Sequence, residues 1–158
     1  MTAKDILYQS KEIQKAIDSL ERVRTQYEIL ADAIPSKPFD EPVVDKTRST
    51  EAPFIRWMDK IMFVETQIKL LKEHQIRINR LIIEAVEALK ETDFKAVIIA
   101  RCLSYLTWEE VCSSLFISMT TAKRWHHLAL EEIEKMDRSG LIWTGVDRCS
   151  LVPDSDSV

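Results

Sequence analysis

The residues whose types and spacing could do chemistry lie in positions 118–130, which read SMTTAKRWHHLAL. This stretch holds two permanent cations, Lys123 and Arg124, and two histidines. It contains no carboxylate, and the next one along the chain is Glu131. Cationic side chains neutralise phosphates, and an arginine can also donate two hydrogen bonds to guanine. The chemistry indicated is therefore recognition of a polyanion such as double-stranded DNA.

A helix that begins after Ser118 would turn part of this stretch outward. Serine is a preferred helix N-cap, and apolar residues at helical spacing predict the inward face, namely Ala122, Trp125, Ala129, Leu130 and Ile133. A helix in the major groove presents its N-terminal half to bases and phosphates. We expect His126 to point outward with its neighbours. The candidate DNA-binding residues are Ser118, Met119, Thr120, Lys123, Arg124 and His127.

A second, shorter helix is predicted just before this one. Thr107 and Glu110 form a T-x-x-E capping box. Its inward face is predicted to be Trp108, Val111, Cys112 and Leu115, and residues 116–118 make the turn to the next helix. A supporting helix over 93–106, capped by Asp93, carries Phe94, Val97, Ile98, Cys102, Leu103 and Leu106. Two helices joined by a three-residue turn and preceded by a third predict a helix-turn-helix domain over 93–136.

Simpler interpretations apply to several of these residues. Phe116 stands in the turn, and a positive φ there would strain it by about 1–3 kcal/mol, so we expect a looser turn. Trp108 and Trp125 are expected to be core anchors. Adjacent histidines on a helix point about 100° apart and have no third ligand nearby, so no metal site and no cofactor is predicted.

Residues 1–92 are predicted to form a long antiparallel, coiled-coil-like helical hairpin, with a proline-rich connector at 35–52. The first helix, over about 2–34, has an apolar stripe made of Ile6, Ile13, Ile17, Leu20, Tyr27 and Ile34, which Val23 and Leu30 widen. The second, over about 52–90, has a stripe made of Trp57, Ile61, Val64, Ile68, Leu71, Ile78, Ile82 and Leu89, extended by Phe54 and thickened by Met58, Leu81 and Val86. Gln75 interrupts this stripe, either to fix the register or as a solvated position. Because the second helix has more apolar surface than the first can cover, we expect a homo-oligomer, with a dimer favoured.

Composition supports an all-α protein. The 158 residues include only 2 Gly and 5 Pro, with 46% hydrophobic and 30% charged residues. A net charge of -4 requires any DNA-binding surface to be local. Three cysteines without CxxC spacing indicate reduced thiols, and the charged N-terminus predicts neither a signal peptide nor a membrane span, which favours a cytoplasmic location. No glycine-rich phosphate loop or catalytic constellation is visible, so the chain is not expected to be an enzyme.

The final segment, 137–158, is expected to be a tail that is partly disordered at its end. Two alternatives remain for its apolar residues. Leu141, Ile142 and Trp143 either dock back on the helices or form an extended segment for a partner.

The run from Thr107 to Ile133 resembles, without gaps, the helix-turn-helix of region 4 of housekeeping sigma factors. The preceding DFKAVIIARCLSYL is similar to the helix that leads into this motif in the ArpU/RinA-type regulators of phages of low-GC Gram-positive bacteria. The resemblance is specific over about forty residues. It implies transcriptional regulation of phage or prophage late genes in a bacterial host cell, with Met119, Thr120, Lys123, Arg124 and His127 in the recognition helix. Here Met119 and Thr120 replace the charged pair usual in sigma factors, which argues against reading a sigma-type promoter element.

The expected function is that of a sequence-specific DNA-binding regulator. Two other functions fit the same pattern. One is a phage DNA-packaging subunit resembling a small terminase, which would form a closed ring of many protomers. The other is an adaptor that binds bacterial RNA polymerase, since region 4 modules also contact polymerase.

Overall fold

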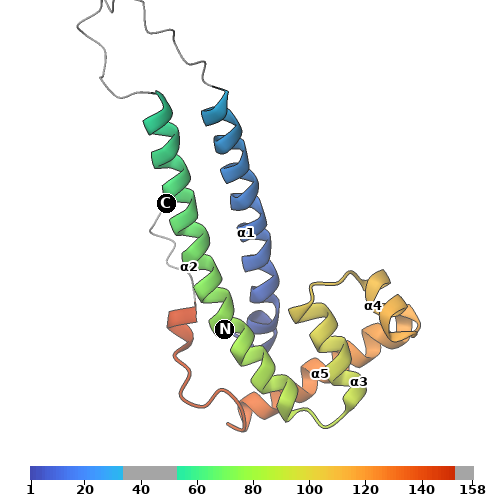
Figure 1. The fold of residues 1–158 in the computed structure, drawn as a ribbon. Helices are drawn as coiled ribbons and strands as arrows, with labels where there is room; N and C mark the ends of the chain where they lie inside the picture. The colour runs from blue at the N-terminus through green and yellow to red at the C-terminus, as the bar shows by residue number, and fades with distance from the viewer. Residues whose placement is uncertain (34–52, 152–158) are drawn as a thin grey trace, which may run out of the picture. The chain divides into compact units, whose positions relative to one another are not determined.

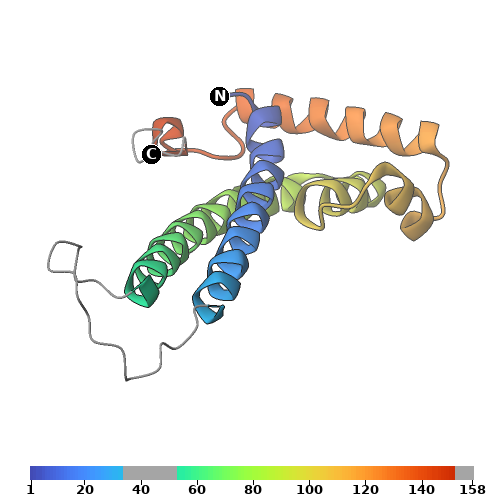
Figure 2. The same ribbon diagram turned by 90° about the horizontal axis from the view of Figure 1, so that it is seen from above.

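The computed structural model describes residues 1–33 and 53–151, whose regular secondary structure is helical, with no strand among them. The prediction of an all-α chain is confirmed. The predicted connector at 35–52 and positions 152–158 of the tail lie outside the described residues. None of the described helices has the length and apolarity that a bilayer crossing demands. In chain order the elements are α1 (Ala3–Asp32), α2 (Pro53–Ala88), α3 (Thr92–Ile98), a π-helical turn η1 (Ile99–Leu103), α4 (Trp108–Leu115), α5 (Met119–Arg138) and a 3-10 turn η2 (Arg148–Leu151) (Figures 1 and 2).

The described residues form two compact units. Unit 1 contains residues 1–15 and 72–151, and unit 2 contains residues 16–33 and 53–71. Each unit takes one portion of α1 and one portion of α2. Within unit 2, the two portions lie side by side and run in opposite directions (Figures 1 and 2).

Apolar residues at helical spacing explain the packing of unit 2. Its buried side chains are Ile17, Ala31, Ile61, Val64 and Ile68. Aromatic rings add to this core, because Tyr27 and Trp57 lie 5.6 Å apart between ring centroids. The predicted stripe was too wide on α2, where Phe54 and Met58 are exposed. A two-helix unit buries only one narrow stripe per helix, so residues at the edge of the stripe stay in water.

In unit 1 a polar network joins α1, α2 and the loop before α4. The Tyr105 hydroxyl accepts a hydrogen bond from Gln75 Nε2 (2.9 Å) and shares one with Ser10 Oγ (2.7 Å). Ser10 Oγ also donates to Asn79 Oδ1, and Gln75 Nε2 donates to Gln14 Oε1 (2.8 Å). Buried polar atoms cost free energy when they lack partners, so this network favours one register of the two helices. Of the two interpretations of Gln75, the structure supports the one in which it fixes the register.

The supporting helix differs from its prediction. It begins at Thr92 with Glu91 as the N-cap and no side-chain cap, so Asp93 lies in the first turn and the prediction that it caps the helix was wrong. The predicted single helix also changes at Ile99 into the π-helical turn η1. The turn ends at Leu103, and Arg101 within it donates from Nη1 to the Leu106 carbonyl oxygen (2.6 Å). Such π turns are rare single-turn insertions inside α-helices, and the apolar spacing of this segment was interpreted as one continuous α-helix.

The segment after α5 docks on α2, which decides between the two alternatives for its apolar residues. Ile142 and Trp143 are buried, whereas Leu141 is 73% exposed. Trp143 Nε1 donates to the Leu81 carbonyl oxygen (2.8 Å), and its backbone N–H donates to Glu84 (3.0 Å). The tryptophan is therefore both packed and hydrogen-bonded.

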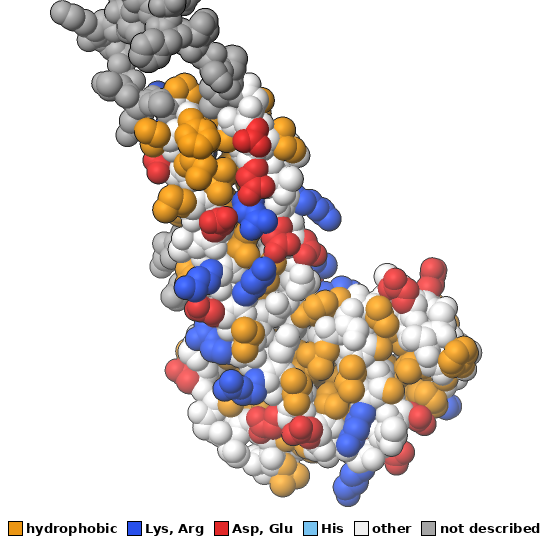
Figure 3. Space-filling view, viewed as in Figure 1, with side chains coloured by type: hydrophobic (Ala, Val, Ile, Leu, Met, Phe, Trp, Pro, Cys, Tyr) orange, Lys and Arg blue, Asp and Glu red, His pale blue; other side chains and the backbone are white. Residues whose placement is uncertain are grey.

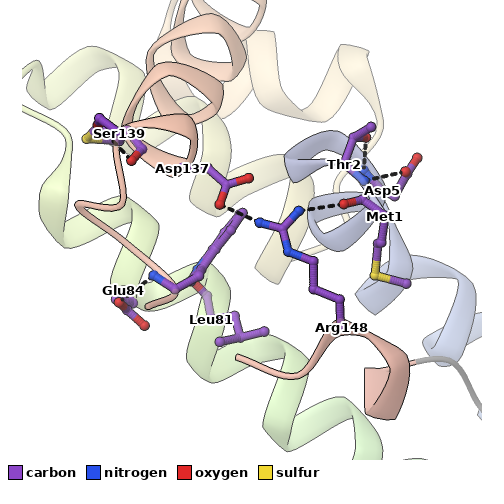
Figure 4. Close-up of polar contacts among 10 residues, drawn as sticks. Met1, Thr2, Asp5, Leu81, Glu84, Asp137, Ser139 and Arg148 are labelled. Carbon is purple, nitrogen blue, oxygen red and sulfur yellow. Dashed lines mark hydrogen bonds and ion pairs between the residues drawn. The ribbon is translucent and has the colours of Figure 1, made fainter. Parts of the chain in front are cut away.

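A single arginine ties this segment to both the N-terminus and α5 (Figure 4). Arg148 Nη1 donates to the Met1 carbonyl oxygen (2.6 Å), and its Nη2 forms an ion pair with Asp137. A guanidinium presents several donors in a fixed plane, so it can satisfy two acceptors from different segments at once. Arg148 thus holds three segments of unit 1 together.

We expect Trp143→Ala to lower the free energy of unfolding by about 3–5 kcal/mol, because it removes a buried ring and leaves a cavity on α2. Leu141→Ala, two residues away at an exposed position, is the control and should change it by no more than about 0.5 kcal/mol. Urea unfolding followed by circular dichroism measures both. Equal effects of the two changes would mean that the segment does not dock in solution.

Candidate nucleic-acid interface

The start of α4 has the predicted capping box. The Thr107 hydroxyl accepts a hydrogen bond from the Glu110 backbone N–H (3.3 Å), and the Thr107 backbone N–H donates to the Glu110 carboxylate (2.7 Å). Hydrogen bonding from the backbone of Thr107, and then from its side chain, lowers the pKa of Glu110. The box fixes where α4 begins, and therefore where its inward residues point.

The turn between α4 and α5 is tight and strained. Phe116 has φ 56° and ψ 42°, the left-handed conformation, and its N–H donates to the Cys112 carbonyl oxygen. The Ile117 N–H donates to the same oxygen at 3.1 Å. The expectation of a looser turn was therefore wrong. The side chain of Phe116 is 94% exposed, so burial of its ring does not offset the strain.

The first turn of α5 is capped as predicted. Ser118 Oγ accepts a hydrogen bond from the Thr121 backbone N–H (3.2 Å) and donates to the Thr121 hydroxyl (2.8 Å). No acidic residue lies in this first turn. The unpaired N–H groups and the helix dipole of such a turn favour a negatively charged partner.

The inward face of α5 lies against the rest of unit 1. Its buried residues are Ala122, His126, Ala129 and Ile133. Ala122 belongs to a core with Val111 of α4 and Ala100 of η1. Partly buried side chains surround this core: Leu106, Trp108, Cys112, Leu115 and Ile117. Trp125 and Leu130, both predicted as inward, are only half-buried.

The opposite face of α5 carries the predicted DNA-binding residues. Thr120, Lys123, Arg124 and His127 are exposed, and Met119 is 37% exposed at the edge of the same face. The structure therefore brings all the predicted residues of this helix, together with the capping Ser118, onto one surface of a single element. We call this surface the basic face.

His126 does not belong to the basic face, and its predicted outward orientation was wrong. Its side chain is buried, with its ring edge-to-face on Trp108 at 5.2 Å and 6.1 Å from the ring of Tyr8. Its spacing from Ala122, Ala129 and Ile133 is that of the inward face, a signal present in the sequence. Polarity predicts an exposed imidazole here, whereas position on the helix predicts a buried one.

Burial is the main reason that the pKa of His126 is lowered from 6.5 to about 4. The charges of Arg101, Lys4 and His127 lower it further. Arg101 is close because its guanidinium lies 4.4 Å from the ring centroid of Trp108, which also contacts His126. The imidazole is therefore neutral at pH 7.

Acidic residues limit the basic face along the helix. His127 Nε2 lies 3.3 Å from Glu131, one turn further on, and Arg138 pairs with Glu134 at 2.9 Å. Lys123 and Arg124, the two cations in the first two turns of α5, lie N-terminal to these acidic residues. Lysine and arginine side chains elsewhere are mixed with acidic ones, as Figure 3 shows along α1 and α2.

The described residues contain no group of three metal-ligating side chains. Cys102 is buried, and burial raises the pKa of its thiol to about 12. Cys112 is a partly buried member of the α4 core.

The buried His126 predicts acid sensitivity. Its pKa is lower in the folded chain than its ordinary 6.5, so only the unfolded chain takes up the proton as pH falls from about 6.5 to 4. The free energy of unfolding is retained above pH 6.5 and should fall by at most about 3 kcal/mol across this window. We expect His126→Gln to remove most of this pH dependence, measured by urea unfolding at several pH values. His127→Gln, at an exposed position, should retain it; equal slopes for both variants would contradict the assignment.

The geometry thus gives a short, exposed, acid-free helix face positioned by a capped turn and a buried core. Comparison with known proteins finds no matching family model, curated protein or solved structure.

Proposed function

We propose that the chain is a sequence-specific DNA-binding transcriptional regulator. In this proposal α4, the turn and α5 act as a helix-turn-helix, and α5 is the recognition helix that enters the major groove. The observation that carries the proposal is the basic face of α5, where exposed Thr120, Lys123, Arg124 and His127 have no carboxylate among them. The resemblance to ArpU/RinA-type regulators makes activation of phage or prophage late genes the setting we propose.

Each residue of the basic face has a role suited to its chemistry. Lys123 neutralises a backbone phosphate, and Arg124 contacts either a phosphate or the acceptor edge of guanine. Thr120 and Met119 are short or apolar enough to contact a base edge or a thymine methyl group. Ser118 caps the first turn of α5 by accepting the Thr121 N–H. The remaining N–H groups of that turn then face a phosphate.

The charge distribution sets the strength of binding. Two free cations correspond to a slope of about −2 in log K against log salt for one copy of the chain. The net charge of -4 works against the approach of DNA, so a single copy binds weakly. Two copies bound to adjacent half-sites would double the number of phosphate contacts, and specific regulators commonly bind in this way.

The double change Lys123→Glu/Arg124→Glu should abolish specific DNA binding, because it places two acids against phosphates. The test is to mix purified protein with sheared genomic DNA of its source at physiological salt and to sequence what is retained. We expect enrichment of a promoter-proximal site with the unchanged protein and at least about a tenfold loss in the variant.

The matched control is Lys135→Glu/Arg138→Glu, which makes the same change of charge near the other end of α5. Both control residues are exposed, and Arg138 pairs with Glu134 outside the basic face. This control variant should still enrich the promoter-proximal site. Equal loss in both variants would show that net charge, and not the basic face, governs binding, and intact binding in the first variant would refute the proposal.

Phe116 favours a second candidate function, a polymerase-binding adaptor. An aromatic ring that is 94% exposed on a left-handed residue does nothing for the fold, and exposed aromatic side chains are common anchors of protein interfaces. In this function the turn, and not the basic face, contacts the partner.

Phe116→Gly separates the adaptor from the DNA regulator. The change should raise the free energy of unfolding by about 1 kcal/mol, because glycine adopts the left-handed conformation without strain and little burial is lost. The second measurement is retention of bacterial RNA polymerase on immobilised protein after nuclease treatment. Retention that disappears in this variant, but not in Leu141→Ala, would establish the adaptor, whereas no retention by the unchanged protein would exclude it.

A further inference from the structure

Unit 2 leaves much of its apolar surface in water. Large hydrophobic side chains that are more than a third exposed include Val23, Ile29, Leu30, Phe54, Ile55, Met58, Met62, Phe63 and Leu70. On the face drawn in Figure 3, apolar side chains gather near the end of α1 and the start of α2. Two helices bury only the stripe that each turns to the other, so this surface has no cover within the described part of unit 2.

One part of this surface is an apolar groove between the two helices. It is lined by Leu20, Val23 and Tyr27 of α1 and by Lys60, Phe63 and Val64 of α2. Phe63 is 62% exposed and Val23 is 39% exposed. The groove therefore presents apolar atoms to water along both helices.

The spacing along α1 shows what shape would fit this groove. Ala16, Leu20, Val23, Tyr27 and Leu30 follow each other at intervals of four, three, four and three residues. This is the heptad spacing by which one helix packs against others in coiled coils and four-helix bundles. This row lies beside the buried stripe that contains Ile17, and its Tyr27 also contacts Trp57 of α2. A second helix pair laid along the groove would complete a four-helix bundle.

We propose that the groove of unit 2 binds the same groove of a second copy of this chain, forming a two-fold dimer. The charges near the groove suit such a partner. Asp59 and Lys60 are consecutive residues that both line it, so a two-fold pairing can place the acid of one copy near the base of the other. The described part of unit 2 carries five basic and six acidic residues, a net charge of −1, so two copies do not repel each other strongly. The same net negative charge would not attract a polyanion such as DNA to unit 2.

The groove is also partly ordered before a partner arrives. Lys60 Nζ lies 4.6 Å from the ring centroid of Trp57 and 5.7 Å from that of Tyr27. This cation–π contact holds the lysine stem against the rings, and less side-chain entropy is lost when the groove is covered.

The size of the surface predicts the strength of the dimer. The portion of α1 in unit 2 is about 25 Å long, and a face two helices wide is about 20 Å across. The face is therefore on the order of 500 Å² per copy, about 1,000 Å² in total, at the lower limit for a specific interface. We expect a dimer that dissociates on dilution. The proposal does not depend on DNA binding.

Sedimentation equilibrium of the full chain, without DNA and over a wide concentration range, tests the dimer. The unchanged protein should shift from monomer to dimer mass as concentration rises. Phe63→Glu places a carboxylate in the groove and should weaken association by about tenfold or more. Met62→Glu is the matched control, because Met62 is 61% exposed on the adjacent residue but does not line the groove, and it should associate like the unchanged protein.

Other results would overturn the proposal. A monomer at every concentration would mean that the groove does not bind a second copy, and a mass above that of a dimer would exclude a closed two-fold pair. Equal weakening by Met62→Glu would place the contact on another face of α2. If circular dichroism shows that Phe63→Glu is unfolded, Val23→Glu tests the same groove from α1, and unchanged association in that variant would refute the proposal.

Discussion

The burial of the inner face of α5 is the constraint on which the rest of the candidate site depends. Ala122 and Ala129 are fully buried, and such small side chains let neighbouring segments approach closely. Ile133 fills the core further along the same face. Once these positions face inward, the period of the helix leaves Lys123 and Arg124 no orientation except outward. The basic face is thus a consequence of packing and does not need contacts of its own to hold it.

Two costly features surround this core. The neutral, buried His126 and the left-handed, exposed Phe116 both lower the stability of the folded chain relative to simpler residues. His126 and Phe116 differ in whether other contacts offset this cost in stability. His126 has ring contacts with Trp108 and Tyr8, which recover part of it through packing. Phe116 has no such compensation, because its ring is 94% exposed.

The two units also differ in how completely their surfaces are satisfied. In unit 1, further polar and apolar contacts join the helices. Tyr105 bonds to both α1 and α2, and Trp143 and Arg148 tie the docked segment to its neighbours. In the described part of unit 2, the buried stripes of the two helices are joined by the Tyr27–Trp57 ring contact and by Lys60, which lies over both rings. The exposed apolar residues of unit 2 are the remainder of that simple arrangement.

The sequence by itself determined the helices, their caps at Thr107 and Ser118, and the basic face of α5. These features depend on local spacing and on hydrogen bonds within a few residues, which a single sequence displays. Only the tertiary structure decided the burial of His126, the π turn after Ile98, the left-handed Phe116 and the docking of Trp143. Each of these features depends on how a residue packs against other parts of the folded chain. Polarity suggested that His126 faced water, but its position on the packed side of α5 placed it against Trp108, because a helix cannot turn one residue outward without turning its whole face.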